Sequence, residues 1–185
     1  LNKKHKFTKQ LQHDTMLCGV ACLEMICEYF NKKYSASYLS TICRPTTEGV
    51  SMLSIRNTAY VLGFDGECGK INLDGIKNIS APCILHWNQN HFIVIYKIKQ
   101  HRQNKYTVYV ADPGKGLLTY TKEEFCNHWM STKTNGEEKG VALLLEPTTF
   151  FYTTQKDTEK APTQNRIKFL WNFNSVVSIK RPVSI

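Results

Sequence analysis

Apolar residues recur at helical spacing in the first third of the chain. Between residues 18 and 30 the apolar positions follow a three-and-four spacing, and Glu24 and Glu28 fall off this stripe. That spacing predicts an amphipathic helix over residues 18–30. The residues of the stripe are Cys18, Ala21, Cys22, Met25, Ile26 and Tyr29.

Two further helices are predicted before residue 64. Ser35 or Ser37 is suited to cap a short helix that runs to about Cys43, because a serine side chain accepts hydrogen bonds from free backbone N–H groups at a helix start. A third helix is predicted from about Ser51 to a stop at Gly63, since glycine often ends a helix.

The pattern changes after Gly63 to short apolar or alternating runs, which are typical of strands. Turn-like NQN and DPGKG segments separate these runs, and TKEEFCNHW predicts a short helix capped by Thr121 with Glu123 and Glu124 in its first turn. Helices first and strands later indicate an α+β fold, with N-terminal helices packed on a mostly antiparallel sheet. The runs are APCILHW, HFIVIYKI, KYTVYVA, LLTY and GVALLLEP.

Size and composition fit one globular domain. The chain has 185 residues, of which 42% are hydrophobic and 21% are charged. We expect the domain to occupy residues 1–150, because residues 151–185 are first polar and then basic and aromatic, as in a linker. No window approaches the roughly 18 consecutive apolar residues of a membrane helix, and the basic start leads into no apolar signal-peptide core.

The net charge of +9 is spread unevenly. Residues 151–185 hold six basic and two acidic residues, and four lysines lie within the first nine positions. A further basic group surrounds a predicted turn, and no zinc-finger, RNA-recognition or helix-turn-helix pattern accompanies it. The charge therefore indicates a solvated or membrane-facing surface rather than nucleic-acid binding. The group consists of Lys97, Lys99, Arg102 and Lys105.

The seven cysteines include no C-x-x-C pair. An odd count without that spacing argues against a zinc site and against a disulfide framework. Without an export signal, we expect free thiols in a reducing compartment, most of them small buried apolar residues. The seven are Cys18, Cys22, Cys27, Cys43, Cys68, Cys83 and Cys126.

Cys18 differs from the others because it stands at the start of a predicted helix. A helix N-terminus supplies partial positive charge and free N–H groups, both of which stabilise a thiolate. Cys22 and Cys27 lie too far inside the helix for either effect. Gly19 would let a peptide backbone approach closely. The alternative is that Cys18 only begins a buried stripe.

A thiolate nucleophile also needs a base and a group that orients the base. His86 and His91 bracket the WNQN turn at the facing ends of two predicted strands, and either satisfies this requirement. A structural role is the alternative for both. The other four histidines lie in charged or terminal surroundings and are expected to be solvated. They are His5, His13, His101 and His128.

Asp112 and Gln12 are candidates for the remaining roles. Asp112 directly follows an apolar strand run, where it leaves the rim of the sheet, although an ordinary Asp-Pro-Gly turn explains the same residues. Gln12, six residues before Cys18, is placed to return to the helix start and donate its amide to an oxyanion.

Taken together, these segments resemble the papain-like cysteine peptidase domain of bacterial peptidase-containing ABC transporters, which processes bacteriocin and other double-glycine leader peptides. The matching blocks are Gln12 followed after five residues by CGVACLEMICEYF, HFIVIYK at His91, and VADPGKG at Asp112. The likeness covers about residues 7–150. Three separate blocks stand in the family's order, which makes coincidence improbable.

The resemblance implies that Cys18 is the nucleophile, His91 the general base, Asp112 the orienting group and Gln12 the oxyanion donor. It also implies a precursor peptide with a double-glycine leader as substrate, no cofactor, and a place on the cytoplasmic side, at the membrane if the chain belongs to a transporter. The partners implied are then the transmembrane and ATP-binding regions of that transporter.

Two other functions compete with this one: a module that binds leaders without cutting them, and another papain-like cysteine hydrolase. The chain also departs from the family's usual pattern. Leu17 stands where an acidic residue often precedes the nucleophile, and Asn31 stands where a glycine often follows the helix. These departures bear on leader preference and on the helix turn rather than on the chemistry.

Overall fold

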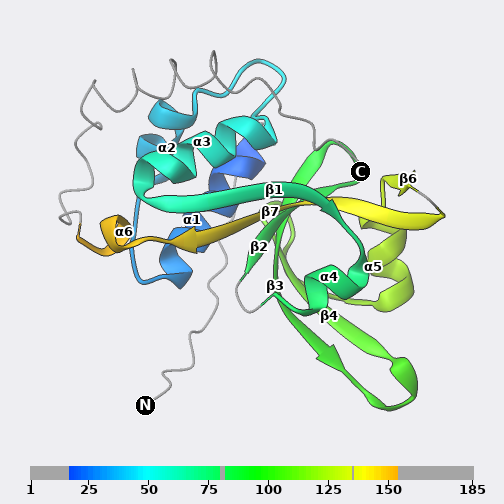
Figure 1. The fold of residues 1–185 in the computed structure, drawn as a ribbon. Helices are drawn as coiled ribbons and strands as arrows, with labels where there is room; N and C mark the ends of the chain where they lie inside the picture. The colour runs from blue at the N-terminus through cyan, green and yellow to red at the C-terminus, as the bar shows by residue number, and fades with distance from the viewer. Residues whose placement is uncertain (1–16, 80–81, 135, 154–185) are drawn as a thin grey trace, which may run out of the picture.

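Three helices open the part of the chain that the structure describes (Figure 1). The structure is a computed structural model that describes residues 17–79, 82–134 and 136–153. All three helices confirm predictions from the sequence. They are α1 (Cys18–Tyr29), α2 (Ala36–Cys43) and α3 (Met52–Leu62).

The helix ends follow the predicted capping chemistry. Ser35, not Ser37, caps α2, because its hydroxyl accepts a hydrogen bond from the Tyr38 N–H at 3.2 Å. Ser51 caps α3 in the same way, and α3 ends at Gly63, whose φ of 100° favours glycine. Thr121 caps α5 (Lys122–Trp129) as part of a capping box.

The strands form one sheet in the order β1-β7-β2-β3-β4-β5, in which every described pair is antiparallel. Five of them confirm the predicted runs: β2, β3, β4, β5 and β7. A short strand, β6, pairs with β7. The strands are β1 (Phe64–Ile71), β2 (Cys83–Trp87), β3 (His91–Gln100), β4 (Tyr106–Asp112), β5 (Gly116–Thr121), β6 (Thr132–Thr134) and β7 (Glu137–Pro147).

Several elements were not predicted from the sequence. The largest is β1, whose sequence FDGECGKI is rich in glycine and charge and lacks an apolar run. It becomes a strand because it lies at the edge of the sheet and pairs with β7 along its whole length. The others are β6, a 3₁₀ turn (Arg102–Asn104), α4 (Leu73–Lys77) and α6 (Thr149–Thr153).

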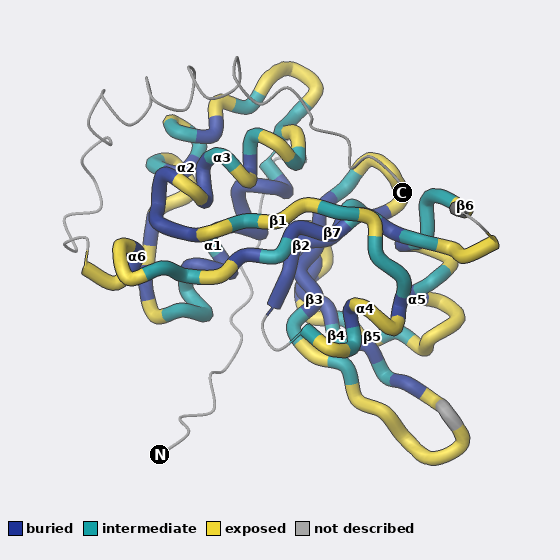
Figure 2. Tube along the Cα trace, viewed as in Figure 1, coloured by how far each residue is buried: buried dark blue, intermediate teal, exposed yellow. Residues whose placement is uncertain are grey.

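At the centre of the sheet both faces are buried (Figure 2). On β2, Ile84 belongs to the cluster beneath α1, α2 and α3, while its neighbours Cys83 and Leu85 belong to the cluster beneath α4 and α5. A strand covered on both faces has no polar side, which explains why β2 and β3 appear as continuous apolar runs.

Helix α1 is buried almost all round, which corrects the prediction of a single apolar stripe. Val20, Leu23 and Cys27 lie off the predicted stripe, yet each is at most 1% exposed. The reason is the position of α1, which contacts α2, α3 and the sheet. Only Glu24, Glu28 and Tyr29 are partly exposed.

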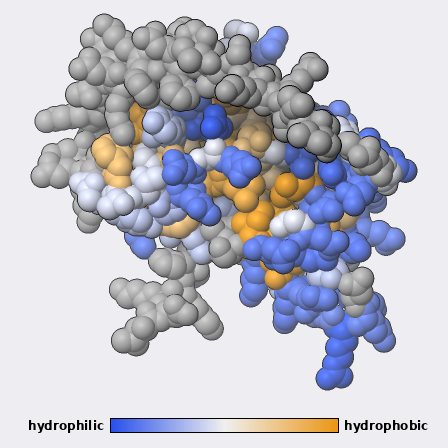
Figure 3. Space-filling view, in the orientation of Figure 1, coloured by the Kyte–Doolittle hydropathy of each residue, from blue (hydrophilic) through white to orange (hydrophobic). Residues whose placement is uncertain are grey.

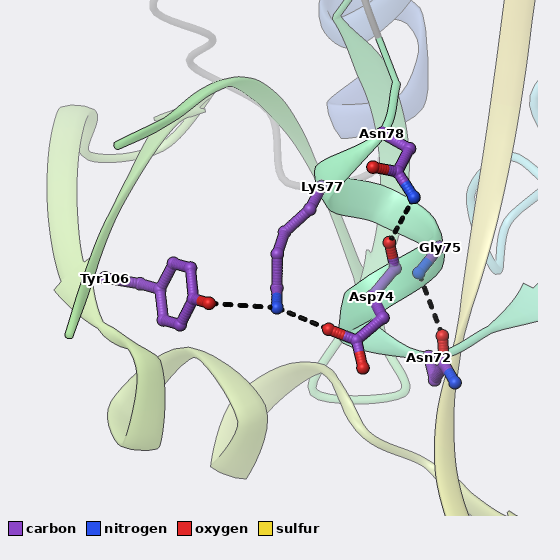
Figure 4. Close-up of polar contacts among 6 residues, drawn as sticks. All are labelled: Asn72, Asp74, Gly75, Lys77, Asn78 and Tyr106. Carbon is purple, nitrogen blue, oxygen red and sulfur yellow. Dashed lines mark hydrogen bonds and ion pairs between the residues drawn. The ribbon is translucent and has the colours of Figure 1, made fainter. Parts of the chain in front are cut away.

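Polar contacts hold α4 against β4 (Figure 4). The Lys77 ammonium forms an ion pair with Asp74 and donates to the Tyr106 hydroxyl at 3.2 Å. Asn72 caps the helix by accepting from the Gly75 N–H at 2.9 Å. These contacts are local to α4 and β4, so we regard them as structural.

The last described helix, α6, packs on the body of the molecule. Phe151 is fully buried and contacts the rings of Phe64 and Phe30, and its carbonyl accepts a 2.5 Å hydrogen bond from the buried Lys32 ammonium. The domain boundary near residue 150 stays a prediction. Within the described ranges, no helix is both long and apolar enough to cross a membrane.

Candidate active site

Three predicted site residues come from separate elements that meet at one end of the sheet. Cys18 is the first residue of α1, His91 is the first of β3 and Asp112 is the last of β4. Because β3 and β4 are antiparallel neighbours, the start of one lies beside the end of the other. Helix α1 packs on β3, which brings the start of the helix to the same end.

His91 and Asp112 form a close pair. The His91 Nε2 atom donates to Asp112 Oδ1 over 2.9 Å, and the same oxygen accepts from the Gly114 N–H at 2.8 Å. Asp112 is 3% exposed and His91 is 26% exposed. The carboxylate is therefore held in place from two sides, and the histidine ring keeps one edge toward solvent.

Cys18 lies on the other side of the same histidine ring. The residue is 5% exposed, and a hydrogen bond between its sulfur and the ring is among the contacts that raise the pKa of His91. Since Nε2 faces Asp112, the ring nitrogen left for the thiol is Nδ1. The histidine thus bridges a sulfur and a carboxylate, as a base with an orienting group does.

The surroundings favour a charged His91. Burial works against charge on the ring, but the hydrogen bonds and charges of Asp112 and Cys18 outweigh it and raise the pKa of His91 to about 9. Burial likewise opposes ionisation of Asp112, but the bonds from His91 and Gly114 bring the pKa of that carboxyl below its usual value. An imidazolium beside a carboxylate therefore persists at neutral pH.

No side chain of the N-cap residue bonds the free N–H groups at the start of α1. That residue is Leu17, which carries no hydrogen-bonding side chain. By contrast, Ser35, Ser51 and Thr121 cap the other helices of eight or more residues. The free N–H groups and partial positive charge at Cys18 are suited to a thiolate and to an oxyanion beside it.

Cys22 and Cys27 are packing residues, as predicted. Both are fully buried and reduced. Burial, followed by the charges of Cys18 and Asp112, raises the pKa of Cys22 well above its usual value, and burial raises that of Cys27 as well. Neither thiol therefore ionises at neutral pH, and Cys18 alone of the three contacts a base.

The structure separates the two candidate histidines. The His86 ring packs against Phe92 with ring centroids 5.3 Å apart, and burial lowers the pKa of His86 despite a hydrogen bond with the Gln89 backbone. His91, one residue past the turn, is the histidine that reaches Asp112. Residue spacing left this choice open because both residues flank the same turn, and the resemblance to the family implied His91.

Gly19 lies where the start of α1 packs closely on its neighbours. A Cβ atom there would lie 2.5 Å from Ile55 Cδ1 and 2.8 Å from Val50 Cγ2. The missing side chain therefore lets α1 pack closely against α3 and the segment before it, and the expectation that it admits a peptide backbone gains no support.

The remaining predicted residues fall into two groups. Gln12, His5 and His13 lie outside the described residues. His101 and His128 are exposed, as expected, but both have partners: His101 bonds Thr107 Oγ1 at 3.0 Å and His128 bonds Asn88 Oδ1 at 2.9 Å. Nowhere in the described ranges do three histidine, cysteine or carboxylate side chains cluster as a metal site would require.

Comparison with known proteins identifies the family of this chain. The peptidase C39 family matches residues 6–135, which is most of the chain. The chain belongs to the peptidase C39 family. This is a family of papain-like cysteine peptidases, and the α+β architecture with helices on an antiparallel sheet is the C39 fold.

Two curated proteins illustrate the relationship to other C39 chains. The chain is 31% identical over 173 residues to the colicin V secretion/processing ATP-binding protein CvaB of Escherichia coli, covering 94% of this chain and 22% of CvaB. It is 31% identical to the lactococcin-G-processing and transport ATP-binding protein LagD of Lactococcus lactis subsp. lactis, covering 64% of this chain and 17% of LagD. The chain thus spans about a fifth of the length of these relatives.

Solved C39 structures share the fold. A double glycine motif protease from an AMS/PCAT transporter, in complex with its leader peptide, aligns with a TM-score of 0.67 at 26% identity, over 78% of this chain and 94% of that one. The peptidase domain of Streptococcus ComA aligns with a TM-score of 0.63 at 23% identity, over 77% of this chain and 100% of that domain, and supports the fold alone.

Proposed function

We propose that the chain is the peptidase domain of an ABC transporter and cleaves the leader from bacteriocin or other peptide precursors after a Gly-Gly, Gly-Ala or Gly-Ser pair. The observation that carries this proposal is His91, which joins Asp112 to Cys18 at the start of α1. Membership of the C39 family and the 26% identity to a double glycine motif protease support the substrate class.

In the proposed mechanism, the helix end and the His91 imidazolium hold Cys18 as a thiolate. The sulfur attacks the carbonyl carbon of the second residue of the glycine pair, and His91 gives its proton to the leaving amine. The neutral imidazole then takes a proton from water, whose oxygen attacks the acyl carbon and releases the sulfur. Asp112 keeps the ring oriented throughout.

Gln12 is proposed as the oxyanion donor, together with the Cys18 backbone N–H. The side-chain bond matters mainly in the transition state, so Gln12→Ala should lower kcat by about 10²–10³ with little change in leader affinity. Wild-type turnover in this variant would remove Gln12 from the site.

The proposed partners are the precursor peptide and the membrane-spanning and ATP-binding regions of a transporter. The names of the relatives CvaB and LagD combine processing with secretion or transport, and this chain matches only a part of each. We place the peptidase, residues 1–150, at the cytoplasmic face of the membrane, with residues 151–185 as a linker toward the transporter.

The deciding experiment is incubation with a precursor whose leader ends in Gly-Gly, under reducing conditions and with mass spectrometry of the products. We expect one cut directly after the pair, and none with Cys18→Ala. Binding of the leader without a Cys18-dependent cut would mean a binding module, and deamidation without chain cleavage would mean another papain-like hydrolase.

His86 and His91 supply a matched pair of variants. Loss of a positioned proton-transfer group costs about 10²–10⁴ in rate, so His91→Ala should lose activity by that factor. His86→Ala should keep most of the activity, because its contacts are Phe92 and the Gln89 backbone. The reverse order of activities would reject His91 as the base.

A further inference from the structure

The far end of the β3–β4 hairpin projects from the body of the molecule (Figures 1 and 2). Among the described residues, β2 pairs with β3 only as far as Ile95, and β4 alone accompanies β3 from Lys97 to Gln100. A register irregularity between Ile95 and Lys97 marks the point where the projecting part begins. We call residues 97–105 the hairpin tip.

The hairpin tip is basic and exposed. Its four cations are all exposed, no acidic residue occurs between residues 92 and 111, and none of the ion pairs among the described residues uses them. Figure 3 shows a hydrophilic surface over this end. The cations are Lys97, Lys99, Arg102 and Lys105. No folded-state contact with a carboxylate therefore accounts for this charge.

We infer that the hairpin tip binds the anionic headgroups of a phospholipid membrane. The hairpin tip projects and does not line a groove, so it fits a flat charged surface. Clusters of four or more Lys and Arg are typical of contact with anionic lipid. Residues 97–105 contain no Phe, Tyr or Trp on which nucleic-acid bases could stack, and the ring of Tyr109 beside them is covered by the Lys97 ammonium, 5.3 Å from its centroid. This inference rests on the proposed function, which places the domain beside a membrane.

The same hairpin carries the catalytic pair at its other end. His91 begins β3 and Asp112 ends β4, so the hairpin tip lies about 20 Å from them at Lys97 and about 30 Å at Gln100, at about 3.3 Å per residue. Contact of the tip with a membrane would leave the site open to solvent and set its distance from the lipid surface. Tip substitutions should accordingly leave cleavage in solution unchanged.

The test is sedimentation of the chain with vesicles of phosphatidylcholine, with and without about one third phosphatidylglycerol, at roughly 0.15 M salt. The hairpin variant combines Lys97→Gln, Lys99→Gln, Arg102→Gln and Lys105→Gln. The matched control combines Lys33→Gln, Arg44→Gln, Lys70→Gln and Lys133→Gln, all exposed elsewhere. Cleavage of the precursor is measured on every variant.

We expect the affinity of the hairpin variant for anionic vesicles to fall by at least about 10-fold, because each cation near the lipid surface raises that affinity by about 5-fold. The affinity of the control variant should change by about 2-fold or less. Equal weakening in both variants would overturn the inference. So would tighter binding of the tip to single-stranded RNA or to an acidic peptide at the same salt. Cleavage of the precursor is measured separately and should be unchanged in the hairpin variant. A negative result in the vesicle assay is therefore distinguishable from a failure of the proposed peptidase function.

A second inference concerns the turn that leads into His91. Asn88 and Gln89 adopt left-handed φ values of 48° and 62°. The Asn88 N–H donates to the His128 carbonyl at 3.0 Å, and His128 Nδ1 donates to Asn88 Oδ1 at 2.9 Å. The His128 ring also stacks on Trp87 with centroids 5.1 Å apart. An exposed histidine of α5 thus holds a strained turn three residues before the catalytic base.

We propose that His128 is a positioning residue for His91. His128→Gln moves the amide nitrogen out to the place of Nε2 and should lower kcat on the order of 10-fold with KM unchanged. His128→Asn keeps a nitrogen at the place of Nδ1 and should restore kcat to within about 2-fold of wild type. Equal kcat values in His128→Gln and His128→Asn would overturn this role. So would a loss of kcat that is explained by the fraction of unfolded protein, measured by thermal melting.

Discussion

Cys18 and Cys22 lie one helical turn apart and differ in what their sulfur atoms meet. The Cys22 thiol is enclosed by apolar side chains, and burial together with nearby charge keeps it protonated. The Cys18 thiol stands at the end of the same helix, beside an imidazole whose pKa is about 9. Position at a helix start, rather than residue type, therefore decides which of the two sulfur atoms can act as a nucleophile.

The first prediction concerns the pH dependence set by the His91–Asp112 pair. The pKa of His91 rises from its usual value near 6.5 to about 9, so its stabilising contribution is complete below about 6.5 and is lost as pH rises through 9. Activity that needs the imidazolium should fall over the same range. A plot of kcat/KM against pH should show a basic limb near 9.

Asp112→Asn removes the charge that raises the pKa of His91. In this variant the basic limb should move to lower pH, and kcat/KM at neutral pH should fall by about 10²-fold, because the ring loses the charged partner that holds it in position. The stability lost on substitution should be larger at pH 6 than at pH 10, because the charged pair exists only below pH 9. An unmoved basic limb would contradict the pairing.

At the scale of elements, the sequence predicted what periodicity and capping control. Thr121 and Ser51 cap the helices that their positions indicated, and the apolar runs became β2 and β3. The sequence pattern did not predict β1, which is a strand only because β7 pairs with it. The residues of β7 lie about 75 positions further along the chain, so no local pattern indicates this pairing. Periodicity could not choose between His86 and His91 for the same reason, because Asp112, the partner that separates them, is distant in the chain; the family resemblance supplied the choice of His91.

The close packing of α1 on α3 gives the second prediction. In Gly19→Ala the new methyl group would overlap Ile55 and Val50, so we expect a loss of about 1–3 kcal/mol in the free energy of unfolding by urea, with reduced activity as the start of α1 shifts. Gly69→Ala is the control, because no atom lies within 4 Å of the added carbon. Equal losses in both variants would show that α1 and α3 are not tightly packed.

At the scale of the whole molecule, the site depends on three layers at once. The proposed nucleophile, Cys18, belongs to the helical layer. The proposed base, His91, and its orienting partner, Asp112, belong to the sheet, which α4 and α5 cover from behind. Cys18 and His91 stay in contact only while the apolar cluster between α1 and β3 is intact. The catalytic distance is therefore a property of the packed core as well as of the local residues.

The third prediction tests how far this packed body extends. Phe151 is fully buried against Phe64 and Phe30, so Phe151→Ala should cost about 3–5 kcal/mol in the free energy of unfolding. Tyr152→Ala, at a side chain that is 59% exposed, should cost far less. Comparable melting temperatures for the two variants would show that α6 is not part of the stable body.

The buried Lys32 ammonium has a mechanical consequence. Lys32 follows α1 in the chain and donates a hydrogen bond to the Phe151 carbonyl of α6. The segment after α1 is therefore bonded to α6, the last described helix. A pull on the chain beyond α6 acts first on this bond and on the aromatic packing around it. Tension applied there is shared between the far end of the helix that carries Cys18, through Lys32 and Phe30, and the first residue of β1, through Phe64.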